Sequence, residues 1–401
     1  MALLTIKNGR VLDPVNKIDK ILDIIIENGK VVLLGRFEKV EGDVLDASGL
    51  WVMPGFIDLH VHFREPGQTH KEDIASGLAA AARGGFTTVC TMPNTTPALD
   101  SAELIRQQIG RAKEVGLGCI LPVGAITVGL SGTTLATHAE MVAAGAVGIS
   151  DDGLTVQDVD VQRRGMKSAA AIGVPLFAHC EEEDEIVERD IKLAESTGAH
   201  LHVCHVSTAR AVELVRAAKQ RGVRITAEAA PHHFTLSQED FDGTDTNFKM
   251  NPPLRDKKDV EAVRQGLADG TIDAIATDHA PHHADEKAQP YALAPNGVVG
   301  LETALPLALS ELVETGLLTP LQFANVLSSA PAAILGINKG NLAVGRPADI
   351  AIVDPTAAYT INPADFASKG KNTPFGGRAV KGKVIHTIFD GKLVVKNSNI
   401  H

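Results

Sequence analysis

Residues 55–63 read Gly-Phe-Ile-Asp-Leu-His-Val-His-Phe, an apolar run that ends in two closely spaced histidines. Side chains alternate along a β-strand, so Asp58, His60 and His62 are expected on one face, with apolar residues on the other. The apolar face is suited to packing against helices. Two imidazoles that are two residues apart on a strand can reach one zinc ion. The stretch therefore predicts a buried strand that ends in a metal site.

The middle of the chain alternates short apolar runs with longer segments of helical periodicity, such as residues 72–83, 102–114 and 161–172. Strands separated by helices are typical of parallel βα architectures, and eight of them predict an α/β fold, a (β/α)8 barrel. The functional residues of such barrels lie at the carboxyl ends of the strands. The candidate strands are residues 55–63, 87–92, 119–126, 146–150, 175–179, 200–205, 224–229 and 273–277.

Both ends of the chain have a different pattern. Residues 1–52 and 340–401 consist of short β-rich runs that are broken by turns such as Asn8-Gly9 and Asp390-Gly391. Two β-rich ends around a barrel predict a small β-sandwich domain that is built from both termini. The catalytic barrel is then expected at residues 53–339.

Further candidate ligands follow the ends of later strands. Asp152 comes after Gly-Ile-Ser-Asp, His179 ends Pro-Leu-Phe-Ala-His, His205 ends Leu-His-Val-Cys-His, and Asp278 ends Ala-Ile-Ala-Thr-Asp. One such residue alone is more often a capping or hydrogen-bonded group than a ligand. Together with the His-X-His pair they supply four imidazoles and two carboxylates. Two divalent ions need such a set if one carboxylate bridges them.

The same alternation orients two histidines of the sixth candidate strand. Leu201, Val203 and His205 are expected to face the barrel interior, and His202 is expected to point outward and serve a structural role. His232 and His233 follow a proline at a strand end, where they either line the mouth of the barrel or lie on the surface.

The composition argues against several classes of partner. The chain has 401 residues, a net charge of -11, a pI near 5.7 and an aromatic content of 4%. An acidic surface disfavours a nucleic-acid backbone or an anionic membrane, and few aromatics disfavour stacking on single-stranded nucleic acid. An acidic protein that binds an anionic substrate needs a locally positive pocket, so an arginine beside a metal motif is significant.

The sequence also indicates a compartment. The cysteines Cys90, Cys119, Cys180 and Cys204 form no Cys-X-X-Cys pair and lie in apolar runs, which predicts reduced thiols. The N-terminus lacks the apolar core of a signal peptide, and no run approaches the roughly 18 apolar residues of a membrane span. The expected location is the cytoplasm.

A series of motifs extends over nearly the whole chain: GFIDLHVHFREPG (55–67), TMPNTTP (91–97), AHCE (178–181), HVCHVS (202–207), PHHF (231–234), KMNPPLR (249–255) and ATDHAPH (276–282). In combination these motifs are highly specific, and they resemble the successive motifs of long-type bacterial dihydroorotases. The resemblance implies a metal-bearing (β/α)8 barrel with a small β-sandwich. It also implies interconversion of N-carbamoyl-L-aspartate and L-dihydroorotate in pyrimidine synthesis, with two zinc ions per chain.

The resemblance implies a role for each candidate ligand. His60 and His62 match the ligands of one zinc ion, and His179 and His205 match those of a second. Related amidohydrolases often bridge their metals with a carboxylated lysine, but the corresponding strand end here has no lysine. The pattern is similar to the subgroup in which an aspartate, here Asp152, bridges the two metals.

Proton transfer and substrate binding are assigned by the same resemblance. Asp278 matches an aspartate that ligates metal and shuttles protons, as a general base and then as an acid. Arg64, Asn94 and His282 match residues that hold the α-carboxylate of the substrate, and Asn251 matches a contact to the pyrimidine ring amide. Without the metal set, Arg64 is better interpreted as half of a surface ion pair and the two asparagines as turn formers.

One segment departs from the family pattern. Long-type dihydroorotases usually carry a longer stretch between the Ala-His-Cys-Glu motif and the next helix, whereas residues 179–182 here run almost directly into the helix expected at 184–196. The missing stretch would be a loop at the carboxyl face of the barrel, where loops shape the site. Its loss is expected to alter the metal bound by His179, open the pocket to water or reduce activity.

Two other functions stay open from the sequence alone. One is another cyclic amidohydrolase, namely a dihydropyrimidinase, hydantoinase or allantoinase, but Asp152 and the carboxylate-binding motifs favour a dihydroorotase. The other is a non-catalytic subunit that scaffolds aspartate transcarbamoylase, although such degenerate homologues lose metal histidines that are present here. A homodimer would be in keeping with the family.

Overall fold

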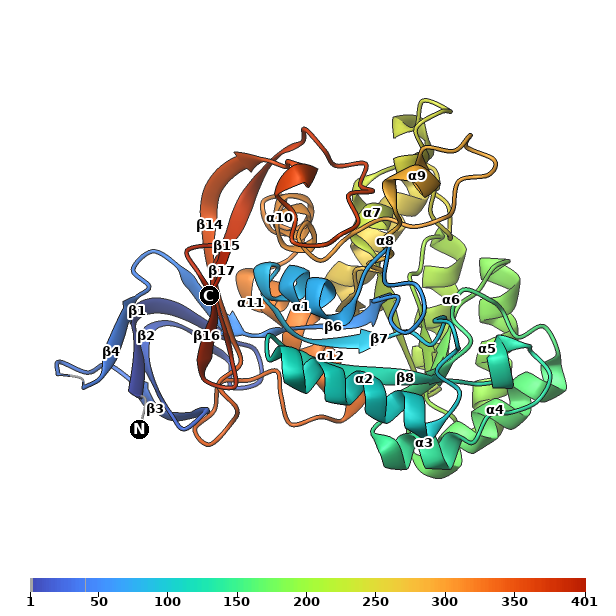
Figure 1. The fold of residues 1–401 in the computed structure, drawn as a ribbon, viewed down its shortest axis with the longest axis horizontal. Coiled ribbons are helices and arrows are strands. Elements are labelled where there is room, and N and C mark those ends of the chain that lie inside the picture. The colour runs from blue at the N-terminus through green and yellow to red at the C-terminus, as the bar shows by residue number, and fades with distance from the viewer. Residues whose placement is uncertain (1–2, 40) are drawn as a thin grey trace.

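Eight parallel strands form the centre of the computed structural model, which describes residues 3–39 and 41–401 (Figure 1). Each strand is hydrogen-bonded to its neighbours in the chain, so the strands keep their sequence order around the sheet. The expected (β/α)8 fold is confirmed. The strands are β6 (Phe56–Val61), β7 (Phe86–Thr91), β8 (Cys119–Ala125), β9 (Gly148–Ser150), β10 (Leu176–Ala178), β11 (Leu201–Val203), β12 (Ile225–Ala229) and β13 (Ala274–Ile275).

The two outermost strands of this sheet meet and close the barrel. Val61 at the end of β6 forms a parallel bridge with His279, which follows β13, and the N–H of His62 donates to the carbonyl of His279 over 2.8 Å. Asp58 strengthens this seam, because its carboxylate accepts hydrogen bonds from the N–H and the hydroxyl of Thr277 at 3.0 and 2.6 Å. Closure therefore brings the carboxyl ends of β6 and β13 to one place.

Helices cover the outside of the barrel, and polar side chains cap several of them. Asp73, Asp158, Thr208 and Asp256 each accept a hydrogen bond from the first turn of the helix that follows. The helices that follow the first seven barrel strands are α1 (Ile74–Arg83), α2 (Ala102–Val115), α3 (His138–Ala144), α4 (Val159–Ile172), α5 (Glu183–Thr197), α6 (Ala209–Gln220) and α8 (Lys257–Asp269).

After β13 the chain continues in shorter helical pieces. These are α10 (Ala304–Ala308), α11 (Pro320–Ala324) and α12 (Ala330–Leu335), with π-helical turns at Leu309–Val313 and Asn325–Ser329. The loops contain α7 (Pro231–Thr235), α9 (Ala284–Lys287) and single 3-10 turns at Val128–Leu130, Gln238–Asp240, Thr246–Phe248 and Pro363–Asp365. Within the described ranges, no helix is long and apolar enough to cross a membrane.

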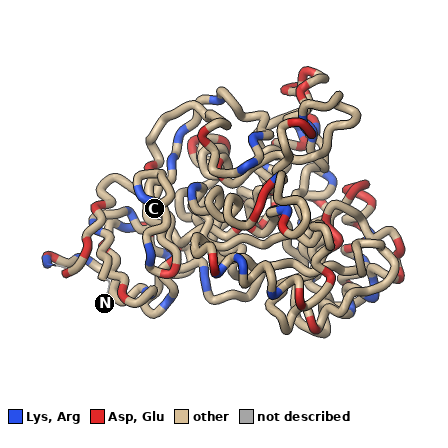
Figure 2. The backbone as a smooth tube through the Cα atoms, viewed as in Figure 1, with Lys and Arg blue, Asp and Glu red and all other residues tan. Residues whose placement is uncertain are grey.

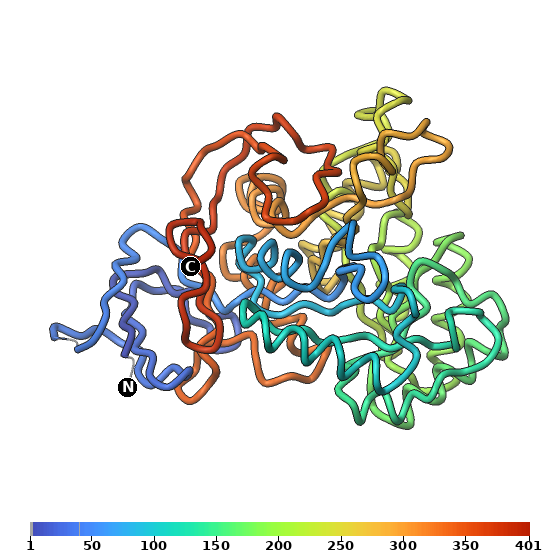
Figure 3. Tube along the Cα trace, in the orientation of Figure 1, coloured from blue at the N-terminus to red at the C-terminus, as the bar shows by residue number. Residues whose placement is uncertain are grey.

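Both ends of the chain contribute to a second sheet beside the barrel, and their blue and red segments lie together in Figures 1 and 3. The strand order is β17-β16-β15-β14-β5-β1-β2-β3, with β4 paired to β1. Side chains from both ends, including Ile24 and Ile350, share one apolar core. The strands are β1 (Leu3–Asp13), β2 (Ile18–Glu27), β3 (Lys30–Gly35), β4 (Asp43–Asp46), β5 (Trp51–Pro54), β14 (Ile350–Thr360), β15 (Ala379–Phe389), β16 (Lys392–Lys396) and β17 (Asn399–Ile400).

The β-rich domain that the sequence predicts from both termini is therefore present. The division of the chain at residues 52/53 and 339/340 stays a prediction, although β5 ends at Pro54 and β14 begins at Ile350. Met1, Ala2 and Val40 belong to the predicted first segment but lie outside the described residues.

Strand β6 does not follow the simple alternation expected from its sequence. Its pairing with β7 shifts register between Asp58 and Val61, as at a β-bulge. Leu59 packs with Cys90 and Val123 in the barrel interior instead of facing the helices. The irregularity allows Asp58 to reach the seam while the histidines that follow it enter the barrel mouth.

The orientation expected for β11 is wrong. Leu201 and Val203 pack in the core between the barrel and its helices. His202 is fully buried inside the barrel, and its ring centroid lies 4.8 Å from that of Phe177. The expectation rests on His205, but β11 ends at Val203, so strand alternation does not extend to His205.

We expect the contacts of Asp58 at the barrel seam to contribute strongly to stability. Asp58→Ala leaves the N–H and hydroxyl of Thr277 buried without their acceptor, and each such loss costs about 1–3 kcal/mol. Urea denaturation is therefore expected to show a loss of roughly 3 kcal/mol in unfolding free energy.

The matched control for this variant is Asp19→Ala, which breaks an exposed ion pair with Arg10. Exposed ion pairs contribute at most about 1 kcal/mol, so the unfolding free energy of this variant is expected to stay close to that of the wild-type protein. Equal losses of unfolding free energy in the two variants would contradict a special role for the seam.

Candidate metal centre

His60 in β6 and His62 just after it direct the same ring nitrogen toward one point. His60 donates from Nδ1 to Oε1 of Glu228 at 2.8 Å, and His62 donates from Nδ1 to Oδ1 of Asn94 at 2.8 Å. Both imidazoles can therefore present the lone pair of Nε2. Oδ1 of Asp278 lies 3.6 Å from Nε2 of His60 and 3.1 Å from Nε2 of His62.

A second pair of histidines faces the first pair across Asp152. Nδ1 of His179 and Nε2 of His205 are 3.0 Å apart, and they lie 3.5 and 3.8 Å from Oδ1 of Asp152. The same carboxylate approaches the first pair, with Oδ1 3.2 Å from Nε2 of His60 and Oδ2 3.5 Å from Nε2 of His62. Asp152 is therefore in contact with all four imidazoles.

Three site residues have positive φ angles just after barrel strands. The φ angles are 59° for Arg64, 34° for His205 and 48° for Asp278. Non-glycine residues rarely adopt this conformation, and it is concentrated at functional sites. It changes the direction of the side chain relative to strand alternation, which is how His205 reaches the barrel mouth.

The buried polar atoms of this cluster fit a divalent metal. Nε2 of His60 and Oδ1 of Asp152 are buried and have no hydrogen-bond partner. Such atoms are costly unless a cation satisfies them. Ligand atoms of His60, His62 and Asp278 lie within 4.8 Å of one another, as do those of His60, Asp152 and His205. Imidazole nitrogen and carboxylate oxygen are among the ligands that zinc prefers.

The surrounding charges keep both carboxylates of the cluster ionised. Burial raises the pKa of Asp152, but the neighbouring histidines outweigh burial and hold this pKa well below its usual value. Burial is likewise outweighed at Asp278, where the contact with His62 and the charges of nearby histidines lower the pKa. Both groups are therefore anionic at neutral pH, as metal ligands must be.

Three polar residues next to the cluster are buried. The carboxylate of Asp151 accepts from the N–H of Thr127 at 3.0 Å, so of the two adjacent aspartates only Asp152 faces the histidines. His232 and His233 are both 2% exposed, which excludes a surface position. Nε2 of His233 donates to the carbonyl of Pro252 at 3.0 Å.

A cavity of about 570 Å³ opens beside the cluster. All four residues assigned to substrate binding line it, together with five candidate ligands: Arg64, Asn94, Asn251, His282, His62, Asp152, His179, His205 and Asp278. His60 lies beneath the cavity rather than in its wall. The cavity therefore combines the metal cluster with the groups that the sequence assigns to the substrate.

Arg64 is the positive group of this cavity. It is 8% exposed, and its Nε donates to the carbonyl of Pro281 at 3.3 Å. No carboxylate among the described residues lies within ion-pair distance of it, so the alternative of a surface ion pair is excluded. Burial lowers the pKa of Arg64 to about 10, which still leaves it charged at neutral pH. A buried guanidinium without a carboxylate partner suits an anionic ligand.

The charge of the rest of the chain does not produce this positive pocket. Figure 2 shows acidic and basic residues interspersed along the backbone of both domains. The net charge is -11, so the positive character beside the metal cluster comes from the local placement of Arg64.

The other assigned substrate residues have partners that the sequence does not reveal. Asn94 accepts from a ring nitrogen of His62, and the amide nitrogen of Asn251 lies 3.3 Å from Nε2 of His179. Nε2 of His282 donates to a backbone carbonyl at 2.8 Å, and burial lowers the pKa of His282 to about 3. Asn94 and Asn251 therefore orient candidate metal ligands in addition to lining the cavity.

Sequence reasoning missed Glu228, which lies in β12 and is 1% exposed. Burial raises its pKa, but hydrogen bonds from His202 and His60 outweigh burial and lower it to about 2. The signal in the sequence is a single charged residue inside an otherwise uncharged strand.

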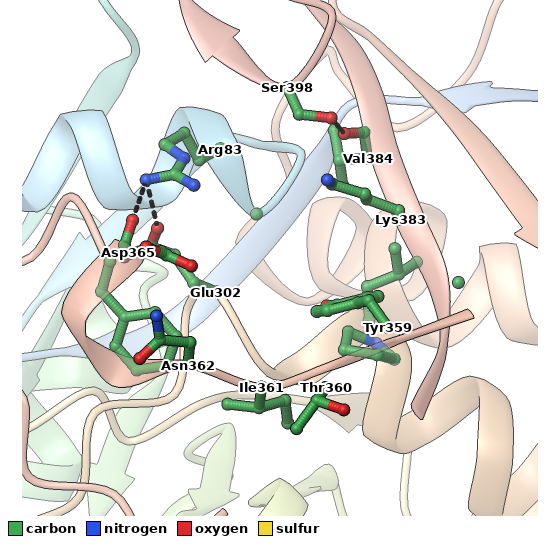
Figure 4. Close-up of a pocket in the computed structure, with 15 residues that line it drawn as sticks. Arg83, Glu302, Tyr359, Thr360, Ile361, Asn362, Asp365, Lys383, Val384 and Ser398 are labelled. Atoms are coloured by element: carbon green, nitrogen blue, oxygen red, sulfur yellow. Dashed lines mark hydrogen bonds and ion pairs between the residues drawn. The ribbon is translucent and has the colours of Figure 1, made fainter. Parts of the chain in front are cut away.

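A second cavity lies where the barrel meets β14 and β15 (Figure 4). Two of its charged groups are paired with each other, since Arg83 contacts Glu302 at 3.3 Å, and Glu302 also accepts from the N–H of Ala367 at 2.9 Å. The described residues that line it include no histidine or cysteine. The metal-type chemistry therefore belongs to the cavity beside the histidine cluster.

The connection between β10 and α5 consists of residues 179–182 only. His179 is its first residue, and the carbonyl of His179 accepts from the hydroxyl of Thr155 at 3.0 Å. Glu183, the first residue of α5, accepts from the N–H of Ser207 at 2.7 Å. The short connection therefore still brings His179 into the cluster, and its effect on metal binding and activity stays a prediction.

Comparison with known proteins agrees with this geometry. The sequence pattern of the amidohydrolase family matches residues 51–394. A dihydroorotase of Syntrophotalea carbinolica is 46% identical over 424 residues, covering 99% of this chain and 100% of the relative. A dihydroorotase of Pelotomaculum thermopropionicum is 48% identical, covering 98% of this chain and 99% of the relative.

Solved structures share the fold. An L-hydantoinase (dihydropyrimidinase) from Arthrobacter aurescens has a TM-score of 0.91 and 25% identity, covering 100% of this chain and 98% of its own. A D-hydantoinase (dihydropyrimidinase) from a Thermus species has a TM-score of 0.86 and 26% identity, covering 99% of this chain and 96% of its own.

The relatives are also longer than this chain. The alignment with the Syntrophotalea carbinolica protein extends over 424 positions, whereas the chain has 401 residues, so part of that relative has no counterpart here. The similarity nevertheless extends over almost the full length of both proteins. The chain belongs to the amidohydrolase family and, within it, to the group of the dihydroorotases.

Proposed function

We propose that the chain is a zinc-dependent dihydroorotase that interconverts L-dihydroorotate and N-carbamoyl-L-aspartate in de novo pyrimidine biosynthesis. Amidohydrolases are metal-dependent enzymes, and the curated relatives are named dihydroorotases. The observation that supports the proposal most strongly is the position of Asp152, in contact with four imidazoles beside a cavity that also contains Arg64.

In this proposal the cluster would hold two zinc ions. His60 and His62 would hold one ion, His179 and His205 would hold the other, and the carboxylate of Asp152 would be shared between them. The distances between these groups support the assignment, because the ring nitrogens of each pair of imidazoles lie close to the carboxylate oxygens of Asp152. When bound, the metal supplies a water nucleophile at neutral pH and polarises a carbonyl oxygen.

Asp278 is proposed to ligate the first metal and to move the proton. Its Oδ1 is 3.1 Å from Nε2 of His62, and the residue lines the cavity. In hydrolysis the water attacks the ring amide carbonyl next to the methylene carbon, and Asp278 accepts its proton and passes it to the departing ring nitrogen. In synthesis the carbamoyl nitrogen attacks the side-chain carboxylate, and Asp278 takes the nitrogen proton and passes it to a carboxylate oxygen, which leaves as hydroxide.

Arg64 is proposed to bind the α-carboxylate of the substrate, with Asn94 and His282 beside it and Asn251 at the ring amide. All four residues line the cavity, and Arg64 has no carboxylate partner among the described residues. A charge-assisted pair with the substrate would fix its orientation and select for its carboxylate.

Another cyclic amidohydrolase is the second candidate, because hydantoinases share the fold. Hydantoins and dihydropyrimidines without a carboxylate leave Arg64 buried and unpaired, which favours dihydroorotate. A non-catalytic scaffold for aspartate transcarbamoylase is disfavoured, because every candidate ligand converges in one cluster. Association with that enzyme and a homodimer stay predictions.

A cytoplasmic location is part of the same proposal. Cys90, Cys119, Cys180 and Cys204 are all free in the structure, as expected for a reducing compartment.

Hydrolysis of L-dihydroorotate by the purified protein tests the function. We expect turnover that a chelator abolishes and zinc restores, with two zinc ions bound per chain, because the cluster supplies ligands for both. Hydantoin and allantoin serve as control substrates. Faster hydrolysis of either would favour the second candidate, and bound zinc without any turnover would contradict a catalytic function.

Replacement of Asp278 tests proton transfer. Asp278→Asn keeps the shape of the side chain but cannot accept the proton, so kcat is expected to fall about 10²- to 10⁴-fold. The matched control is Asp285→Asn, whose side chain is 92% exposed and which is expected to keep its kcat. A near-normal kcat for Asp278→Asn would remove the residue from the mechanism.

Replacement of Arg64 tests recognition of the carboxylate. Arg64→Gln is expected to raise the KM for dihydroorotate about 10- to 100-fold, because hydrogen bonds between charged groups are lost. Dihydrouracil lacks the carboxylate and is the matched substrate, for which kcat/KM is expected to stay unchanged. An unaltered KM for dihydroorotate would contradict the assignment.

A further inference from the structure

A chain of hydrogen bonds, buried from His60 to His202, runs through the barrel interior to the start of β11. Oε1 of Glu228 accepts from Nδ1 of His60 at 2.8 Å, and Oε2 accepts from Nε2 of His202 at 3.0 Å. Oγ1 of Thr226 lies 2.8 Å from Nδ1 of His202 and 2.8 Å from Nε2 of His200. The chain therefore links β6, β12 and β11 beneath the metal cluster.

With every imidazole neutral, the donors and acceptors of this chain have one consistent arrangement. A carboxylate only accepts, so His60 donates from Nδ1 and His202 donates from Nε2 to Glu228. Nδ1 of a neutral His202 then accepts the hydroxyl proton of Thr226, and the oxygen of Thr226 accepts from Nε2 of His200. Nε2 of His60 is left with its lone pair and without a hydrogen-bond partner.

Packing seals the part of this chain next to the metal cluster from water. Glu228 is 1% exposed, and His60 and His202 are fully buried. The ring of Phe177 meets His202 edge-on, with 4.8 Å between the ring centroids. A carboxylate in such surroundings is costly unless strong donors compensate for the lost water, and the two imidazoles provide them.

His60 differs from the other histidines of the cluster in the charge of its partner. His62 and His179 contact the neutral amides of Asn94 and Asn251. Among the residues that the structure describes, Glu228 is the one carboxylate outside the candidate ligands that contacts a histidine of the cluster. An ionised acceptor makes an imidazole a stronger metal ligand than a neutral one does.

We propose that Glu228 is a positioning residue that holds His60 in the tautomer with Nε2 directed at the metal. His202, Thr226 and His200 fix the orientation of Glu228. The inference rests on the proposed function and deepens it, because it names a residue outside the ligand set on which metal affinity depends.

Glu228→Gln tests the inference with a side chain of nearly the same shape. The amide has one accepting oxygen and one donating nitrogen, so it cannot accept from both imidazoles. We expect zinc affinity, measured by competition with a chromogenic chelator, to fall about 10- to 100-fold. Excess zinc is expected to restore most of the turnover with an unchanged KM, because Glu228 does not line the cavity.

The matched control is Glu302→Gln, in the cavity of Figure 4. The side chain of Glu302 is 8% exposed and contacts Arg83 instead of a histidine, so the same chemical change is made at a largely buried carboxylate away from the cluster. The zinc affinity of Glu302→Gln is expected to equal that of the wild-type protein. Circular dichroism and thermal denaturation of the metal-free variants establish that both fold.

Nitrogen NMR of the zinc-loaded wild-type protein with labelled histidines provides a second measurement that needs no variant of Glu228. We expect His60 to carry its proton on Nδ1 and to have none on Nε2. This result supports the inference even if Glu228→Gln does not fold.

Equal zinc affinities of Glu228→Gln and Glu302→Gln, or a proton on Nε2 of His60, would overturn the inference while leaving the proposed function intact. Failure of the wild-type protein to bind zinc would instead overturn the proposed function, and this inference with it.

Discussion

The carboxylate of Asp152 lies among four imidazoles, and the rest of the candidate metal centre is arranged around that contact. A buried carboxylate persists only where cations or hydrogen-bond donors surround it. Here the partners come from β6 and from the residues after β10 and β11, while Asp152 follows β9. No single βα unit can assemble such a group. Barrel closure brings the strand ends together, so the chemistry depends on the seam between β6 and β13.

Three further buried carboxylates have different roles because their neighbours differ. Asp58 accepts from the backbone and hydroxyl of Thr277, which ties two strands together. Glu228 accepts hydrogen bonds from two imidazoles, and one of these bonds orients His60. Asp278 contacts a histidine and also lines the cavity, where a substrate can exchange protons with it. Burial and partner, rather than residue type, decide what each carboxylate does.

The barrel and the candidate ligands were predictable from the sequence because both depend on local pattern. Short apolar runs between helical segments mark the strands, and His60, Asp152 and Asp278 stand at strand ends. Alternation could not predict which side chains of β11 face the barrel interior, since the strand ends before His205 and the φ of His205 is 34°. The contact of Glu228 with His60 joins residues that are 168 positions apart, and no local pattern in one sequence pairs them.

The central claim, that Asp152 bridges two metal ions, is tested most directly by anomalous X-ray diffraction at the zinc edge from crystals grown with zinc. Two peaks per chain are expected, one between His60 and His62 and the other between His179 and His205. An oxygen of Asp152 is expected within bonding distance of each peak, about 2.0–2.2 Å. A single peak, or two peaks that Asp152 does not touch, would contradict the claim.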